Sequence, residues 1–150
     1  MVQTSTTSYI ESYGSKSINE MVKKLRATTD SRRRYEYVLW LAKKLPNLPE
    51  ELRTERLKVK GCVSQVFVLG SFIEGKLQWQ GYSDALITRG LLAFLIKGLN
   101  KLTPQEVLDI NPSFIKATGL QGSLTPSRAN GFLNIFLSMQ AQAKAHASNI

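Results

Sequence analysis

The sequence predicts a single α+β domain of two layers, in which a small antiparallel sheet packs against helices. Three observations lead to this fold class. The chain has 150 residues, the usual size of one domain. Its apolar residues recur at helical spacing over 18–45, alternate at strand spacing over 63–81, and return to helical spacing after residue 84. It shows neither an internal repeat nor a change of composition that would mark a domain boundary.

The first part of the chain predicts two helices. A short helix over 18–27 comes before a longer one, which ends before Pro46 because proline does not continue a helix. Asp30 or Ser31 is the candidate N-cap of the longer helix. Its apolar face contains four residues at positions i, i+3, i+4 and i+7: Val38, Leu41, Ala42 and Leu45. The polar residues that follow, up to residue 58, indicate a connector.

A β-hairpin is predicted over about 63–81. Strand formers and alternating polarity mark both of its strands, and Glu74-Gly75 between them is typical of a tight turn. The alternating residues of the two strands are Val66, Phe67, Val68, Leu69, Leu77, Gln78, Trp79 and Gln80.

Three helix starts follow the hairpin. Ser83 is a candidate N-cap for a strongly apolar helix over 84–99, which we expect to be buried on most sides. The run from Thr103 to Glu106 is a capping box with proline in the first turn. Thr125-Pro126 repeats that opening before the last helix. We therefore assign 18–145 to the folded domain, 1–17 to a disordered leader with eight Ser or Thr residues, and 146–150 to a tail.

Composition excludes several classes of protein. The chain is 43% hydrophobic and 21% charged, as is usual for a folded domain in water. The longest apolar stretch, 91–96, is far shorter than the roughly 20 residues of a membrane span. A single cysteine excludes an internal disulfide, and together with the lack of an apolar signal segment it favours the cytoplasm.

Metal and protease chemistry are also not expected. The one histidine, His146, lies in the alanine-rich tail, where it would have to fold back to pair with Cys62. A zinc site needs three or four nitrogen, sulfur or carboxylate ligands, which one cysteine and one tail histidine do not supply. We expect neither a metal nor a bound cofactor.

The positive charge is concentrated in one segment. The net charge is +9, and residues 21–60 hold twelve basic and five acidic residues, a surplus of +7. This pattern fits either a solvated helical face or a surface that attracts an acidic protein or nucleic acid. No nucleic-acid-binding module is recognisable in it, so nucleic acid is the less favoured partner.

Three residues are candidates for chemistry. Cys62 follows Gly61 at the mouth of a loop, where glycine's conformational freedom would help to present the thiol. Arg128 lies in the first turn of the last helix, where a cation opposes the helix dipole unless an anion offsets it. Asp84, in the first turn of a predicted helix, is explained by helix stabilisation alone. A buried structural cysteine and a surface arginine are the simpler readings of the other two.

Read together, three blocks resemble the signature of the SufE family. They run from Val59 to Val66, from Gly81 to Ala85 and from Leu124 to Gly131, in the order and at the spacing of that family. The resemblance covers about 30–139, most of the chain. It implies a fold similar to that of the SufE and IscU-type proteins, although the metal-ligand set of IscU-type scaffolds is missing here.

The resemblance implies a sulfur acceptor for a SufS-type cysteine desulfurase, feeding iron–sulfur cluster assembly. The desulfurase, not this chain, would carry pyridoxal phosphate. Cys62 stands at the position of the acceptor cysteine, which would take persulfide sulfur, stimulate the desulfurase and pass the sulfur on. The chain would thus be a carrier and activator rather than a stand-alone enzyme. A SufBCD-type scaffold is a candidate next partner, and homodimer formation is left open.

The other signature positions imply supporting roles. Asp84 would orient the Cys62 loop or meet the partner, and Arg128 would favour the thiolate and the persulfide anion. Ser64 and Gln65 flank the acceptor, and Gly61 precedes it. Two departures from the family pattern are Val63, where a polar residue is frequent, and Tyr82, where an acid is common. Two alternatives to the sulfur acceptor stay open. One is a basic nucleic-acid-binding module with an inert cysteine, and the other is a protein that docks on the desulfurase without sulfur transfer.

Overall fold

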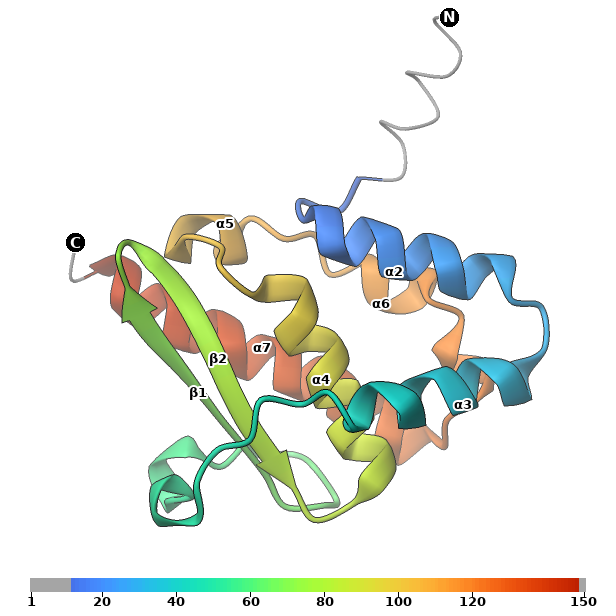
Figure 1. Ribbon diagram of the computed structural model, residues 1–150, viewed down its shortest axis with the longest axis horizontal. Coiled ribbons are helices and arrows are strands. Elements are labelled where there is room, and N and C mark those ends of the chain that lie inside the picture. The colour runs from blue at the N-terminus through green and yellow to red at the C-terminus, as the bar shows by residue number, and fades with distance from the viewer. Residues whose placement is uncertain (1–11, 149–150) are drawn as a thin grey trace, which may run out of the picture.

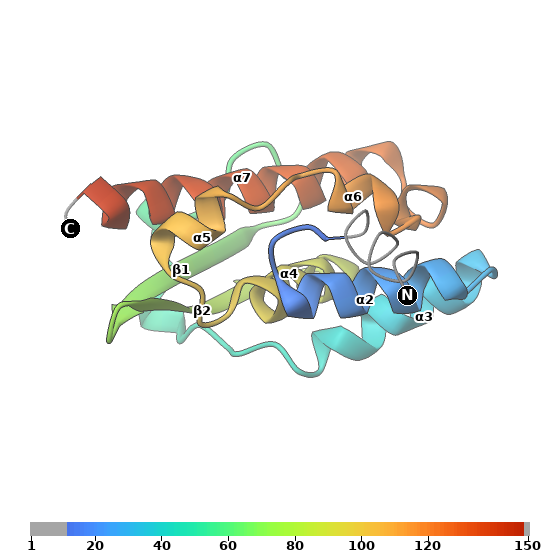
Figure 2. The same cartoon turned by 90° about the horizontal axis from the view of Figure 1, so that it is seen from above.

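Helix α4 (Leu86–Leu99) lies at the centre of the protein, whose computed structural model describes residues 12–148 (Figure 1). Eleven of its fourteen residues are buried, as the apolar sequence predicts. Helices α2 (Lys16–Ala27) and α3 (Ser31–Ala42) pack on one side of α4, and α7 (Pro126–Ser148) lies on the other (Figure 2). The α+β class is confirmed.

The two N-terminal helices start at side-chain caps. The Ser15 hydroxyl accepts a hydrogen bond from the Ile18 N–H, and the Asp30 carboxylate accepts one from the Arg32 N–H, which confirms Asp30 as N-cap. Ser15 also donates to the Gly98 carbonyl at the end of α4, at 2.6 Å. The expected leader therefore joins the fold at its end, from Tyr13 on, because Tyr13 packs on the core and accepts a hydrogen bond from the Asn111 N–H. Residues 1–11 lie outside the described residues.

The sheet is a hairpin of β1 (Val66–Ile73) and β2 (Lys76–Ser83), paired antiparallel in register from Val66–Ser83 to Ile73–Lys76. The turn was correctly placed: Glu74 and Gly75 have φ of 51° and 83°, the left-handed pair that a two-residue hairpin turn requires. The hairpin begins and ends later than the predicted 63–81, because residues 63–65 form a loop instead.

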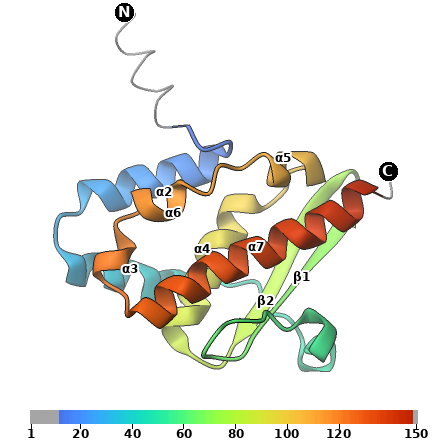
Figure 3. The same ribbon diagram turned by 180° about the vertical axis from the view of Figure 1, so that it is seen from behind.

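The hairpin is covered on its inner face by α4 and α7, as the view from behind shows (Figure 3). Its outer face is closed in part by the connector, which contains two 3-10 turns, η1 (Glu50–Leu52) and η2 (Glu55–Leu57). There a small second cluster forms from Leu48, Leu57 and Phe67. The main core lies between α4, α7 and the short C-terminal elements, and contains stacked and edge-on aromatic rings: Phe94, Phe114, Phe132 and Phe136.

The chain between α4 and α7 forms three short elements. They are α5 (Pro104–Leu108), α6 (Phe114–Ala117) and η3 (Leu120–Gly122), of which only α5 was predicted. Its capping box is present as expected, with the Thr103 hydroxyl and the Glu106 carboxylate each bonded to the other residue's N–H. The two remaining elements are too short to give a period in the sequence.

Two predicted element ends differ from the structure. Ser83 ends β2 and does not cap α4, which begins at Leu86 without a side-chain cap. The reason is that Asp84 pairs with Gln65 and so continues the extended chain beyond the strand. The expected tail is part of α7 as far as Ser148, because His146 packs on Phe72 with ring centroids 5.7 Å apart. No helix among residues 12–148 is long and apolar enough to cross a membrane.

Candidate functional site

Cys62 lies on the loop 59–65 that leads from the connector into β1, and the N-terminal half of this loop is held by α7. Gly61 has a φ of 80°, a left-handed conformation that glycine adopts without strain. Its carbonyl accepts a hydrogen bond of 2.8 Å from the side-chain amide of Asn134. A Cβ at position 61 would lie 2.6 Å from that amide nitrogen, so the contact itself requires glycine.

Asp84 holds the other end of the same loop. Its carboxylate accepts a hydrogen bond of 3.0 Å from the Gln65 N–H, and its own N–H donates to the Gln65 carbonyl at 3.3 Å. The loop is thus fixed to α7 at Gly61 and to the end of β2 at Gln65. The three residues between these fixed points, Cys62, Val63 and Ser64, form the segment that presents the thiol.

The Cys62 side chain is half-buried against the start of α7. Its Sγ lies 3.8 Å from the Gly131 carbonyl oxygen, a weak thiol contact. A gap of about 10 Å³ beside it is barely the size of one water molecule. The gap is lined by residues of the loop, of α4 and of the first turns of α7: Cys62, Val63, Ser64, Thr88, Ser127, Arg128 and Gly131.

Burial raises the pKa of the Cys62 thiol above its ordinary value, because the charged thiolate would lose solvation there. This direction is opposite to the effect we expected from Arg128. The Arg128 guanidinium lines the same gap, but its Nη1 donates to the Thr88 hydroxyl on α4 at 3.0 Å. In the resting protein burial therefore favours the protonated thiol over the thiolate.

Arg128 also takes part in the start of α7. Its N–H donates to the Thr125 hydroxyl at 3.3 Å, the cap that the Thr-Pro opening predicts. The side chain then crosses to Thr88, which is buried and lies in the first turn of α4. Arg128 thus links the two helices on either side of the Cys62 gap, whatever charge it contributes.

The surface around the loop is apolar in part and basic in part. Val63 is 80% exposed and Leu86, the first residue of α4, is 54% exposed, both high values for aliphatic side chains. Next to Asp84, the ring of Tyr82 has the Arg53 guanidinium 3.6 Å from its centroid and that of Arg89 4.9 Å away. The departure at Tyr82 therefore forms a cationic stack beside the loop.

Sequence reasoning found Cys62, Asp84 and Arg128, and the structure brings all three to one loop and its borders. It missed Asn134 and Thr88, which carry no motif and become visible only when α4 and α7 approach the loop. His146 lies elsewhere, with its Nε2 3.3 Å from the Gly70 carbonyl near the hairpin turn. Among the described residues, no three His, Cys, Asp or Glu side chains are grouped as a metal site requires.

The fold has a solved counterpart. The solution structure of a hypothetical protein from Thermus thermophilus matches 89% of this chain and 98% of its own length, with a TM-score of 0.77. The two sequences are 24% identical, so this likeness concerns the fold.

Sequence comparison gives closer relatives. An uncharacterised SufE-like protein of Synechocystis is 52% identical over 126 residues, which cover 84% of this chain and 79% of the relative. SufE-like protein 1 of Arabidopsis thaliana, named as chloroplastic/mitochondrial, is 39% identical over 84% of this chain. The cysteine desulfuration protein SufE of Plasmodium vivax is 40% identical over 75% of it.

The matched region spans less than half of two of these relatives, 34% of the Arabidopsis protein and 46% of the Plasmodium protein. The family described as SufE, Fe-S metabolism associated domain, matches residues 19–143. That match takes in the Cys62 loop and both of its fixed points, together with Arg128. By its sequence over most of its length, the chain belongs to the SufE family.

Proposed function

We propose that this protein accepts sulfur from a cysteine desulfurase onto Cys62 and passes it on in iron–sulfur metabolism. The observation that carries the proposal is the chain's single cysteine, presented on a loop that Asn134 and Asp84 fix at its two ends. Family membership supports the direction of the chemistry, since relatives in two Plasmodium species are named cysteine desulfuration proteins. The donor would be a SufS-type enzyme that carries its own pyridoxal phosphate.

The transfer is a thiol–persulfide exchange. The Cys62 thiolate attacks the terminal sulfur of the donor's persulfide, a new S–S bond forms, and the donor's S–S bond breaks to release its thiolate. The proton given up by Cys62 ends on the donor's thiol, so the exchange needs no external oxidant or reductant. A lone cysteine suits a carrier, because the persulfide has no neighbouring thiol with which to form an internal disulfide.

The protonated resting thiol sets a condition on this mechanism. Since the thiolate is the nucleophile, a raised pKa keeps Cys62 poorly reactive toward oxidants and electrophiles while the protein is free. Activation then requires the docked donor to draw the loop out of its apolar contact or to bring a positive charge near the sulfur. The gap of about 10 Å³ has room for little more than one added atom and shelters the terminal sulfur after transfer.

Docking uses the rim of the loop. The exposed Val63 and Leu86 offer apolar contact, and the Arg53–Tyr82–Arg89 stack offers positive charge to an acidic region of the donor. Asp84 fixes the position of the loop relative to this docking surface. Ser64 and Gln65 belong to the docking surface. Arg128 is the positioning residue that joins α7 to α4 next to the sulfur and becomes a partner of the persulfide anion once the loop moves.

Further points stay predictions. They are stimulation of the desulfurase, delivery to a SufBCD-type scaffold and a cytoplasmic location, while homodimer formation is left open. The Arabidopsis relative is named as chloroplastic/mitochondrial, and this name describes the location of that relative only.

The test is intact-protein mass spectrometry after incubation with a SufS-type desulfurase, pyridoxal phosphate and cysteine. We expect a gain of one sulfur atom on the native chain, reversed by a reductant, and no gain on Cys62→Ser. A matched variant, Val63→Ser, keeps the thiol but alters the rim and should slow loading without abolishing it.

Two results would contradict the proposal. One is an unmodified native chain beside a desulfurase that turns over cysteine. The other is an equal gain on Cys62→Ser, which would place the sulfur on another group. The first result combined with stable binding of the desulfurase would leave a docking protein without sulfur transfer.

A further inference from the structure

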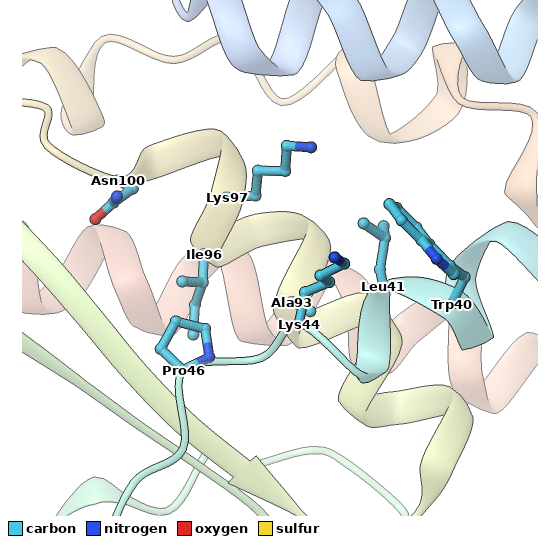
Figure 4. Close-up of a pocket in the computed structure, with 8 residues that line it drawn as sticks. All are labelled: Trp40, Leu41, Lys44, Pro46, Ala93, Ile96, Lys97 and Asn100. Carbon is cyan, nitrogen blue, oxygen red and sulfur yellow. The ribbon is translucent and has the colours of Figure 1, made fainter.

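A second surface lies on the side of α4 opposite to α7, along α2 and α3 (Figure 2). The Cys62 loop is on the α7 side, where the Cys62 Sγ contacts the Gly131 carbonyl and Asn134 holds Gly61. At one end of the second surface, a pocket of about 330 Å³ opens between the end of α3, the start of the connector and α4. Figure 4 shows its lining, with Trp40 on one wall and the Lys44 and Lys97 side chains extending into the opening. Trp40 is 45% exposed, a high value for so large an aromatic side chain.

This pocket continues into a groove. A hollow of about 150 Å³ shares Trp40 and Lys97 with it, and a third of about 440 Å³ shares Lys24 and Tyr37 with the second. The three hollows follow the border of α2 and α3 as far as the turn that joins them. We call this surface the aromatic groove and define it by Lys24, Arg33, Tyr37, Trp40, Lys44 and Lys97.

The cations of the aromatic groove are placed on its rings. Lys24 Nζ lies 4.9 Å from the Tyr37 ring centroid, and Lys44 Nζ lies 5.0 Å from that of Trp40. The two rings also stack on each other, with centroids 5.9 Å apart and planes at 20°. A nucleobase would have to displace these contacts to stack there, whereas a carboxylate can meet the ammonium groups where they are.

The rest of the aromatic groove completes the chemistry. Its floor in the 330 Å³ pocket is apolar, formed by Leu41, Pro46, Ala93 and Ile96. Two acidic residues, Glu20 and Asp30, line the hollows beside α2, against four basic ones in the aromatic groove. The surplus of +7 in 21–60 extends this positive field beyond the aromatic groove. The same surface of a second copy carries the same positive charge, so it would be repelled from the aromatic groove.

We propose that the aromatic groove docks an acidic segment of a partner protein, which inserts an apolar side chain into the pocket beside Trp40. Its carboxylates pair with Lys24, Lys44 and Lys97, and its apolar anchor contacts Leu41, Ile96 and the open edge of the indole. The Cys62 loop is held against α7, which lies across α4 from this surface, so the segment stays bound whether or not the thiol is engaged. The proposal does not depend on sulfur transfer.

The experiment uses the full chain and the fluorescence of Trp40, since the other tryptophan, Trp79, is buried at 2% exposure. The probe is a synthetic peptide of glutamates with interspersed leucines. A glutamate–serine peptide of equal charge and an oligothymidylate of equal charge serve as comparisons. We expect the glutamate–leucine peptide to change the Trp40 emission saturably and to bind at least tenfold more tightly than either comparison. Its affinity should fall as salt is added, because salt screens the charge pairs.

Charge reversal locates the binding. The variant Lys44→Glu/Lys97→Glu should lose at least tenfold in affinity for the peptide. The matched control Lys76→Glu/Lys144→Glu makes the same change in net charge at the hairpin turn and on α7, and it should lose far less. All four lysines are exposed, so folding is retained, and circular dichroism checks it.

Any of four results would overturn the proposal. The first is that the glutamate–leucine peptide causes no saturable change in Trp40 emission, and the second is that both charge-reversal variants lose the same affinity for it. The third is that the glutamate–serine peptide binds as tightly as the glutamate–leucine peptide. The fourth is that the oligothymidylate binds more tightly than the peptide and loses affinity in Lys44→Glu/Lys97→Glu. The last result would identify a surface for single-stranded nucleic acid instead. Persulfide loading of Cys62 is measured separately and has no bearing on these outcomes.

Discussion

A single residue, Cys62, has surroundings that favour the thiol over the thiolate. We therefore predict that its alkylation by iodoacetamide rises with pH through a midpoint above that of the urea-unfolded chain, because burial raises the pKa of the thiol. The folded chain holds this proton more tightly than the unfolded chain. The contribution of this proton to the free energy of unfolding is complete at pH values below the pKa of Cys62 in the unfolded chain. It is lost as the pH rises through the higher pKa of Cys62 in the folded chain. A midpoint at or below that of the unfolded chain would contradict the role of burial.

Arg128→Ala tests the charge on the same thiol. The Arg128 guanidinium is bonded to Thr88 in the resting protein, and burial alone accounts for the direction of the Cys62 pKa shift. We expect the alkylation midpoint of this variant to match that of the native chain. A midpoint raised further by the substitution would show that Arg128 does favour the thiolate, as the sequence led us to expect.

Asn134 is predicted to hold the Cys62 loop in its closed position. Asn134→Ala removes the hydrogen bond to the Gly61 carbonyl, which is worth about 0.5–1.5 kcal/mol in similar settings. The loop should open more often, so Cys62 should be alkylated roughly two- to tenfold faster at a fixed pH. Ser138→Ala, one turn further along α7, is the matched control and should leave the rate unchanged. Equal rates in all three proteins would assign the loop's position to Asp84 alone.

The sequence located the thiol but not its environment. Cys62, Asp84 and Arg128 stand in recognisable blocks, and the structure gathers them at one loop. Asn134 and Thr88 stand in helices whose sequence shows only periodicity, so their contacts depend on how those helices cross the loop. The direction of the Cys62 pKa shift cannot be read from the sequence for a related reason: the sequence shows charges, whereas burial depends on packing.

Among the elements, α3 and α4 come into close contact at Gly90. A Cβ built at this position would lie 2.1 Å from the Val38 carbonyl oxygen, a backbone atom that can move only with its helix. Gly90→Ala should therefore lower the free energy of unfolding by roughly 1–3 kcal/mol or more. Urea unfolding measures this loss. Gly122→Ala, where nothing lies within 4 Å of the added atom, should stay within about 1 kcal/mol of the native chain.

One side chain of helix α7, Gln142, bonds two backbone groups on the free edge of β1. The Gln142 amide accepts from the Gly70 N–H at 2.9 Å and donates to the Val68 carbonyl at 2.8 Å, as a neighbouring strand would. Gln142→Leu should cost roughly 1–3 kcal/mol for each backbone group that loses its partner. Gln142→Glu keeps an acceptor for the Gly70 N–H, so its loss of unfolding free energy should be about half that of Gln142→Leu. Thermal unfolding of the three proteins measures both losses. Equal stability of all three would mean that water replaces the amide.

Element prediction succeeded where a local signal exists. The cap at Asp30, the capping box at Thr103 and the turn at Glu74-Gly75 were all placed correctly, since each is set by neighbouring residues. The prediction of Ser83 as an N-cap was wrong. Asp84 pairs with Gln65, nineteen residues away in the chain, and this contact overrides a good local capping signal. Long-range contacts also explain why the sequence predicts a tail where α7 in fact continues, since His146 packs on Phe72.

Over the whole molecule, two surfaces of different chemistry lie on opposite sides of α4. The Cys62 side combines a small sheltered gap with exposed aliphatic residues, and the opposite side is the aromatic groove with its ring-bound lysines. The charge imbalance read from the sequence predicted a basic face but not its location relative to the thiol. That arrangement follows from the packing of α3 and α7 against one shared helix.

The burial of α4 has a consequence for hydrogen exchange. With eleven of fourteen residues buried, its amide protons should exchange only when the whole domain unfolds, more slowly than those of α2 or the 59–65 loop. Deuterium uptake followed by mass spectrometry measures this, and rapid uptake in α4 would show that it opens locally. A partner bound on either side raises the free energy of global unfolding, so α4 would slow alike in both cases. The central helix thus reports the total occupancy of the protein, while local protection tells which side is covered.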